Sequence, residues 1–411
     1  MMRKCGGCDH TDLQSLFSLG DIPPVNAFLL PSEVKNEIGY PLELFFCKEC
    51  TLIQLGDCVP PEKLFSNYLH LSSASESNIQ HLKEVADWVA ERDSKKLQDK
   101  KVLEIGSNDG TLLSFLKNHT ANVVGMDPAQ NLAAEAKKRG VRTYTDFFLQ
   151  ESAAKLVKTE GQFDWIVALN VVPHTPQFIS LLKGARGALA PGGRMMIEGA
   201  YVVETILNGQ FDTIYHEHVY NFSIHSLNYA MKRVGLQILD VEIIPTQGTS
   251  FRVLLARDDD PEQASGNLKK LLGEEKQKGM TDVKTLAKAA EKIKAFPDQL
   301  KAKLKELRKK SASPIIGLGA PARGVVILNY CKLNTDDLQY IIDDTVLKQG
   351  RLTPGVHIPV AGWDHAPIQP GQVFLLLSWN YRKEMIKKLN QRQIQGTLLI
   401  PFPHLEEVKI G

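Results

Sequence analysis

The sequence predicts an α/β protein in three parts: a small N-terminal head, a central domain with a doubly wound parallel sheet, and a second α/β domain at the C-terminal end. Three observations predict this plan. Two closely spaced cysteine pairs lie near the N-terminus, strands begin to alternate with helices near residue 100, and a second strand–turn–helix unit begins near residue 314. Strands that alternate with helices are typical of parallel sheets, which bind ligands beyond the carboxyl ends of their strands.

The head carries the first chemical signal. Four of the six cysteines form two CxxC pairs, Cys5 with Cys8 and Cys47 with Cys50. Each pair lets two thiolates reach one ion from a tight turn, and two pairs supply the four soft ligands that tetrahedral Zn²⁺ favours. We therefore expect Zn²⁺ at these cysteines, in a β-rich head over residues 1–80. The alternatives are four unrelated buried thiols, a redox-active CxxC or a nucleic-acid-binding zinc knuckle, and the scarcity of cysteine elsewhere in the chain counts against the first.

The central domain is expected over residues 81–257. A helical period covers residues 78–90 and leads into the alternating region. The expected strands cover residues 101–105, 122–126, 163–169 and 194–198, and the expected helices cover residues 112–118, 131–139 and 178–189. Pro191-Gly192-Gly193 is expected to form the turn before the last of these strands.

A charged, helix-prone segment over residues 258–311 is expected to link the central domain to the last one. Its basic end contains Lys301, Lys303, Lys305, Arg308, Lys309 and Lys310. Such a helix can touch a membrane or nucleic acid, but a solvated helix face between domains explains the pattern more simply. The C-terminal domain is expected over residues 312–411, with strands at 314–318, 340–343 and 373–378, so that it loosely repeats the plan of the central domain.

Composition narrows the class of protein. The chain has 411 residues, 43% of them hydrophobic and 23% charged, which is typical of a soluble protein with several domains. A net charge of +2 gives no strong field for a polyanion and counts against nucleic acid as the main partner. The first residues lack the apolar core of a signal peptide, and no apolar run is long enough to span a bilayer. We expect a cytoplasmic monomer without a membrane partner.

The turn after the first central strand predicts a cofactor site. It reads Gly106-Ser-Asn-Asp-Gly110, and its glycines let the backbone turn sharply and approach a ligand closely. No phosphate-binding lysine follows, so the turn is not a P-loop. Asp127 ends the second strand, where an acid accepts hydrogen bonds from ribose hydroxyls. An adenosyl cofactor held without phosphate contacts fits S-adenosylmethionine better than NAD; the alternative is an ordinary tight turn.

A cluster of proton-transferring groups lies at Tyr215-His216-Glu217-His218. On a strand, His216 and His218 would share a face opposite Glu217, whereas on a helix Tyr215 and His218 would share one. A histidine with a near-neutral pKa suits a general base, and Tyr215 suits a hydrogen bond to a substrate oxygen. A metal site and purely structural histidines remain open alternatives. His174 follows the strand at 163–169, at the ligand-facing rim of the sheet.

The chain resembles the S-adenosylmethionine-dependent C-methyltransferases of deoxysugar biosynthesis, which act on nucleotide-linked 4-keto-6-deoxysugars. The resemblance covers nearly the whole chain. Its blocks are the cysteine head, Glu104 to Gly110, Phe211-Asp-Thr-Ile-Tyr-His-Glu-His218, Gly319-Ala-Pro-Ala-Arg-Gly324, Leu328 to Cys331, Leu347 to Arg351 and Pro354 to Val360. The family implies a zinc head that helps to cover the sugar, a Rossmann-like methyltransferase domain, and a Rossmann-like C-terminal domain that helps to hold the nucleotide.

The resemblance also implies roles for individual residues. The implied catalytic group has His218 as the base that removes the C3 proton next to the 4-keto group, with Tyr215, Glu217 and His174 around it. The implied cofactor-binding residues are Glu104, Gly106, Asn108, Gly110, Asp127, Pro128, Phe147 and Asn170. The implied substrate-binding residues are Tyr68, Arg252, Arg323, Asn329 and Lys348. A C-methyltransferase acting on a different ketone and a non-catalytic zinc-knuckle module are the rival functions.

Overall fold

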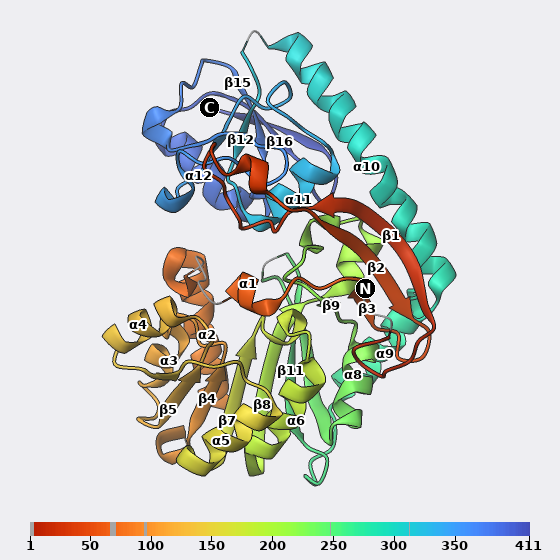
Figure 1. Ribbon diagram of the computed structural model, residues 1–411, viewed down its shortest axis with the longest axis vertical. Helices are drawn as coiled ribbons and strands as arrows, with labels where there is room; N and C mark the ends of the chain where they lie inside the picture. The colour runs from red at the N-terminus through yellow and green to blue at the C-terminus, as the bar shows by residue number, and fades with distance from the viewer. Residues whose placement is uncertain (1–3, 66–70, 94–96, 247, 312) are drawn as a thin grey trace.

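Three β-sheets organise the protein (Figure 1). The computed structural model describes residues 4–65, 71–93, 97–246, 248–311 and 313–411. Tyr68, one of the expected substrate-binding residues, lies outside these ranges. In Figure 1 the C-terminal α/β lobe lies above the central one, with the N-terminal strands along one side.

The N-terminal sheet is not self-contained. Its four strands, in spatial order, are β1 (Leu13–Ile22), β2 (Tyr40–Cys47), β3 (Ile53–Leu55) and β9 (Tyr220–Asn221). The last strand comes from far along the chain: Ile53 pairs with Asn221 and Gln54 with Tyr220. The head therefore completes its sheet with residues that lie directly after His218.

The central sheet has seven strands. Their spatial order is β10 (Leu236–Ile244), β11 (Ser250–Arg257), β8 (Leu189–Ala200), β7 (Phe163–Leu169), β4 (Val102–Ile105), β5 (Val123–Met126) and β6 (Arg142–Tyr144). The strands from β8 to β6 run parallel, and β10 and β11 add an antiparallel edge. The central strand β4 is buried along its whole length, as its short apolar sequence predicts for a strand covered on both faces.

One expected turn is wrong. Pro191-Gly192-Gly193 lies inside β8, where the pairing with β7 jumps from Leu189 to Arg194. Gly192 has φ +71°, so the chain bends within the strand, but pairing resumes on both sides of the bend. The local turn signal was real, yet the neighbouring strand keeps the segment in the sheet.

The helices of the described residues are α1 (Pro61–Phe65), α2 (Glu76–Arg92), α3 (Thr111–Leu116), α4 (Gln130–Lys138), α5 (Gln150–Glu160), α6 (Phe178–Ala188), α7 (Val202–Leu207), α8 (Ile224–Arg233), α9 (Gly266–Gln277), α10 (Val283–Lys310), α11 (Ala322–Tyr330) and α12 (Arg382–Gln391). The expected helices at 78–90, 112–118, 131–139 and 178–189 are confirmed as α2, α3, α4 and α6, and the structure adds helices for which the sequence analysis made no prediction. Helix α10 runs along the side of the molecule and contacts β1 and α7 (Figure 1). Its apolar stripe is buried, while the basic residues of its last turn are exposed.

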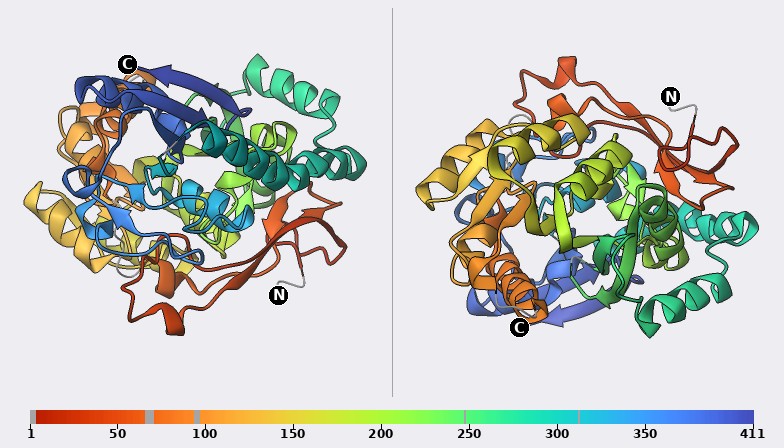
Figure 2. Two further views of the ribbon diagram at one scale, coloured as in Figure 1. Left: turned by 90° about the horizontal axis from the view of Figure 1, so that it is seen from above. Right: turned by 90° about the horizontal axis from the view of Figure 1, so that it is seen from below.

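The C-terminal sheet has six strands. Their spatial order is β14 (Val360–Ala361), β13 (Ile341–Ile342), β12 (Ile316–Leu318), β15 (Gln372–Leu376), β16 (Gly396–Ile400) and β17 (Glu406–Ile410). All neighbours are parallel except β16 and β17. Figure 2 shows the N-terminal strands along the outside of the molecule rather than within either lobe. Among the described residues, no helix combines the length and apolar character needed to cross a bilayer.

The two α/β lobes share a local plan. In the central lobe the Gly106 N–H donates to the Met126 carbonyl at 2.7 Å, and in the C-terminal lobe the Gly319 N–H donates to the Ile342 carbonyl at 2.7 Å. Each bond ties the turn after the first strand of its lobe to the end of the adjacent parallel strand. Both turns line the same cavity.

Candidate active site and metal site

A cavity of about 660 Å³ brings the parts of the chain together. Its walls come from α1 and α2 on the N-terminal side, from the turns after β4, β5 and β7, from the segment around His218, and from the C-terminal lobe. Ligands of doubly wound sheets bind at such strand ends. The cavity is large enough for a small-molecule site.

The turn after β4 is shaped for close approach. Gly106 has φ +70°, and a Cβ atom there would lie 2.4 Å from Cγ2 of Val171. Asn108 also has a positive φ, +48°. Its N–H donates to Oδ2 of Asp127 at 2.9 Å, and the Ala129 N–H donates to Oδ1 at 2.9 Å. The Asp127 carboxylate is thus fixed at the cavity wall, and each oxygen keeps a second lone pair that can accept from a ribose hydroxyl.

A buried acid without a partner lies beside this turn. The Glu104 side chain is 5% exposed, and its Oε2 atom has no hydrogen-bond partner among the described residues. Burial, followed by repulsion from Asp127 and Asp109, raises its pKa well above the ordinary value. A cation in the cavity would satisfy this oxygen. The carboxylates of Glu104 and Asp127 therefore fit the positively charged S-adenosylmethionine better than the diphosphate of NAD.

The structure brings most of the expected cofactor residues together. Those that line the cavity are Glu104, Gly106, Asn108, Asp127, Pro128, Phe147 and Asn170. Gly110 does not line it; a Cβ atom there would lie 3.0 Å from Cβ of Ala136, so this glycine allows the turn to pack on α4. The N-terminal side covers the turn, because the Ser72 N–H donates to Oδ1 of Asn108 at 2.9 Å.

The expected histidine cluster forms neither a strand nor a helix but a turn. The His218 N–H donates to the Tyr215 carbonyl at 2.8 Å, which places the two rings 4.0 Å apart. His174 approaches from the other side, with its ring centre 4.7 Å from that of His218. His216 faces away and contacts the Tyr40 carbonyl at 3.2 Å. The strand alternative is therefore wrong, and His216 and His218 do not form a joint metal site.

The environment of His218 sets its protonation. Its Nδ1 lies 2.6 Å from the Thr213 carbonyl, which can only accept, so Nδ1 carries the proton and Nε2 keeps a lone pair. Burial, and then the charge of His174, hold the pKa of His218 well below its ordinary value. Burial likewise lowers the pKa of His174 to about 4. His218 is consequently neutral near pH 7, the state that a base requires.

Tyr215 and Glu217 complete this turn. Burial, and then the charge of Glu217, raise the pKa of Tyr215, so its hydroxyl stays protonated and can donate a hydrogen bond. Glu217 accepts a hydrogen bond from Nδ2 of Asn26 in the N-terminal segment. Both side chains line the cavity with His218 and His174.

The expected substrate residues divide into two groups. Arg323 and Lys348 line the cavity. Arg252 does not; it is buried in ion pairs with Glu198 and Glu242. Asn329 does not either, because its Nδ2 donates to the Val325 carbonyl at 2.9 Å and to the Pro354 carbonyl at 3.0 Å. It holds a loop of the C-terminal lobe in place.

Several cavity residues escaped the sequence analysis, among them Asp343, Trp363 and Lys388. Asp343 ends β13, and its carboxylate accepts from the Ala320 N–H at 2.6 Å and the Thr345 N–H at 2.8 Å, as Asp127 accepts from its own turn. Trp363 lies nearby, with Nζ of Lys388 5.0 Å from its ring centre. The signal for Asp343 was its position, since it ends the second strand of the second α/β unit as Asp127 ends that of the first. No comparable signal marked Trp363.

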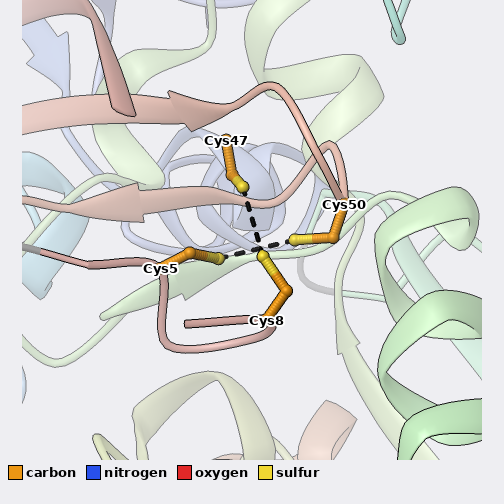
Figure 3. Close-up of side chains that lie close together, drawn as sticks. All are labelled: Cys5, Cys8, Cys47 and Cys50. Atoms are coloured by element: carbon orange, nitrogen blue, oxygen red, sulfur yellow. Dashed lines mark hydrogen bonds between the residues drawn. The ribbon is translucent and has the colours of Figure 1, made fainter. Parts of the chain in front are cut away.

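The four cysteines of the head converge as expected (Figure 3). Their sulfur atoms all lie within 4.8 Å of one another, with Cys5 and Cys50 3.4 Å apart and Cys8 and Cys47 3.5 Å apart. Tetrahedral Zn²⁺ with bonds of ~2.3 Å separates its sulfurs by about 3.8 Å, so the four thiols fit the ion. A closed set of four thiolates is typical of a structural site.

Three family models match successive parts of the chain. A "putative zinc binding domain" matches residues 5–65, a "methyltransferase domain" matches residues 77–241, and a "C-methyltransferase C-terminal domain" matches residues 245–403. The C-methyltransferase NovU of Streptomyces niveus is 31% identical over 407 residues, which cover 97% of this chain and 95% of NovU.

Two further similarities cover smaller shares of the chain. A ubiquinone biosynthesis O-methyltransferase of Pseudomonas aeruginosa is 28% identical over 113 residues, which cover 27% of this chain and 48% of that protein. The structure of magnesium protoporphyrin IX methyltransferase from Synechocystis, with bound SAH, aligns with a TM-score of 0.35 and 16% identity over 44% of this chain and 83% of that one.

Proposed function

The chain belongs to the family of S-adenosylmethionine-dependent C-methyltransferases with an N-terminal zinc-binding domain, and we propose that it methylates C3 of a nucleotide-linked 4-keto-6-deoxysugar. The observation that carries this proposal is a neutral His218, with its Nε2 lone pair available, in the same cavity as the turn of Gly106 and Asp127. A base and a site for a methyl donor in one cavity are what carbon methylation needs.

His218 is the general base of the proposed reaction. The 4-keto group acidifies the C3–H bond, and Nε2 of His218 removes that proton to give an enolate. Base catalysis of this kind contributes roughly 10²–10⁴-fold to a rate. The Thr213 carbonyl holds the ring in the required tautomer throughout.

The rings of Tyr215 and His174 lie 4.0 Å and 4.7 Å from that of His218, and this closeness supports a role for both side chains at the enolate oxygen. The protonated Tyr215 hydroxyl can donate a hydrogen bond to it, and such preorganised donors stabilise developing charge. S-adenosylmethionine, when bound, supplies the electrophilic methyl group. The cavity walls hold the nucleophilic carbon close and aligned, an effect worth roughly 7–11 kcal/mol.

The distribution of charge supports a nucleotide in the C-terminal half of the cavity. Among the described residues, the lysines and arginines that line the cavity, Arg323, Lys348 and Lys388, all come from the C-terminal lobe, where Asp343, Asp344 and Glu384 also line it. Arg323 is paired with Asp212, so Lys348 and Lys388 are the cations that can meet a diphosphate. A diphosphate needs such cations. The Asp343 carboxylate can accept a hydrogen bond from a ribose hydroxyl, as that of Asp127 can.

The proposal is tested by incubating the protein with methyl-labelled S-adenosylmethionine and a panel of dTDP-, GDP- and CDP-linked 4-keto-6-deoxysugars. We expect label at C3, identified by NMR, with one nucleotide preferred. Nucleotide-free ketones should react poorly. Efficient methylation of such ketones, with no reaction of any nucleotide sugar, would refute the substrate class.

The base is tested with His218→Asn. This variant should bind both ligands and lose roughly 10²–10⁴-fold in kcat. It should also lose any exchange of the sugar C3 proton with heavy water. His119→Asn is the matched control, because His119 pairs with Asp87 and does not line the cavity. Parent-like turnover in His218→Asn would exclude His218 as the base.

A further inference from the structure

The C-terminal lobe reaches the catalytic turn through one fully buried carboxylate. Asp212 lies in the 3₁₀ turn Phe211–Thr213 and is 0% exposed. The Arg323 guanidinium donates to both of its oxygens, from Nε at 2.9 Å and from the outer nitrogen at 3.0 Å. Nε1 of Trp379 donates to the same carboxylate at 2.6 Å, and the guanidinium lies 4.6 Å from the Trp379 ring centre.

The Arg323–Asp212 ion pair, here called the clamp, holds the segment that orients His218. Asp212 directly precedes Thr213, whose carbonyl accepts the His218 Nδ1 proton at 2.6 Å. Movement of Asp212 would therefore move the acceptor that fixes the tautomer and the direction of Nε2. A buried ion pair is weak evidence for stability, and its best-attested use is to specify one geometry.

The positive charge of Arg323 also lowers the pKa of His218. The ionisable groups around His218 are His174 beside it, Tyr215 and Glu217 on its own turn, Asp212 on the preceding turn and Arg323 on α11. Burial and His174 are larger causes of the low pKa of His218, and Arg323 adds to them. The positive charge disfavours a second proton on the ring.

We propose that Arg323 is a positioning residue for the base, which it holds in place through the buried pair with Asp212. The inference rests on His218 being the base of the proposed function. It gives the C-terminal lobe a part in proton abstraction as well as in binding. It also differs from the role of substrate ligand that the family resemblance implies for Arg323.

The test compares Arg323→Met and Arg323→Lys with Arg382→Met. Arg382 makes the matched pair, because it also donates twice to one carboxylate, Glu406, but at an exposed site outside the cavity. Arg323→Met should lower kcat by about 10²-fold, the cost of a misplaced catalytic group, while KM for both substrates stays within about twofold. Arg382→Met should resemble the parent.

The pH profile supplies a second readout. The active form has neutral His218, so activity falls as pH decreases through its pKa. Without the Arg323 charge this pKa rises, and the acid limb of kcat/KM should move to higher pH in Arg323→Met but stay in place in Arg323→Lys. NMR titration of the His218 ring without substrate should show the same shift, and an unchanged ring pKa in Arg323→Met would overturn the proposal.

Two further results separate the possibilities. A raised KM for the sugar nucleotide with parent kcat in Arg323→Met would make Arg323 a substrate ligand and overturn the inference, while leaving His218 as the base. Parent activity in His218→Asn would instead overturn the proposed function itself. If Arg323→Met does not fold, the double variant Asp212→Asn/Arg323→Met leaves no uncompensated buried charge and should show the same loss of kcat.

Discussion

The two α/β lobes hold an aspartate in the same way but line the cavity beside it with different charged side chains. Asp127 and Asp343 each end the strand next to the first strand of their lobe, and each accepts two backbone N–H bonds from the turns beside it. Beside Asp127 lies Glu104, whose Oε2 has no partner among the described residues, and no described lysine or arginine of the central lobe lines the cavity. The wall around Asp343 contains Lys348 and Lys388 together with Asp344 and Glu384.

The two lobes show that the same backbone arrangement does not determine which ligand is bound. The turn and its acid suit a ribose in either lobe. The side chains around them decide the charge of the rest of the ligand: an acidic wall favours a cationic sulfonium compound, and a wall with lysines favours a diphosphate. The fold does not determine the ligand, because ligand specificity depends on a few side chains at the site.

The largest effect is expected from disrupting the zinc-binding head, because this would disturb the site around Asp127 and the site around Asp343 at once. The head contacts both lobes: β9 pairs with β3, and Leu29 pairs with Leu352. Cys47→Ser, or removal of zinc by a chelator, should therefore abolish turnover and weaken both ligands. Metal analysis of the parent should give about one zinc per chain.

Cys58→Ser is the control for the head, since Cys58 lies outside the four converging thiols. It should keep zinc and activity. Full activity of a zinc-free Cys47→Ser protein would show that the two lobes do not depend on the head.

The second prediction tests whether Asp127 and Asp343 bind different ligands. Asp127→Asn should weaken S-adenosylmethionine by about 1.5–3 kcal/mol, the range for a hydrogen bond to a charged group, and leave the nucleoside diphosphate unaffected. Asp343→Asn should do the reverse. Calorimetric titration of both variants with both ligands measures the four affinities, and loss of S-adenosylmethionine binding in Asp343→Asn would contradict the division of labour.

The third prediction concerns pH. Free Glu104 has a raised pKa because it is buried, and a bound cation favours its ionised form. Affinity for S-adenosylmethionine should therefore rise with pH, by at most about tenfold per unit, and level off above the raised pKa. Binding should release a proton, seen by calorimetry in buffers of different ionisation enthalpy.

Glu104→Gln should remove this pH dependence. Glu151→Gln is the control, because Glu151 is exposed in the first turn of α5 and lies outside the cavity. A parent-like proton release in Glu104→Gln would assign the coupling to another group.

Much of the fold was predictable because it depends on local pattern. The buried run of β4, the turn at Gly106 and the acid at Asp127 are read from a short stretch of sequence, and the two CxxC pairs predict their own convergence. The bend at Gly192 was read as a turn because its strand partner, β7, is remote from the local sequence.

The site was less predictable, for the same reason. The cluster at Tyr215 and His218 was visible, but its turn is held by contacts with Asn26 and Tyr40, which lie far away in the sequence. The family resemblance implied that Asn329 and Arg252 bind the substrate, and only three-dimensional contacts show that their polar atoms are bound elsewhere. The Arg323–Asp212 clamp joins residues that are 111 positions apart and leaves no local signal.

The place of β9 in the head has a consequence for the order of synthesis. All four cysteines, and β1 to β3, leave the ribosome well before Tyr220 and Asn221. At roughly 5–20 residues per second, the closing strand follows by roughly 10–30 s. During that interval the Ile53–Leu55 edge is open, and an open edge can pair with another chain. The growing chain therefore has its four cysteines complete before His218 is synthesised, and the segment that follows His218 is the one that closes the edge.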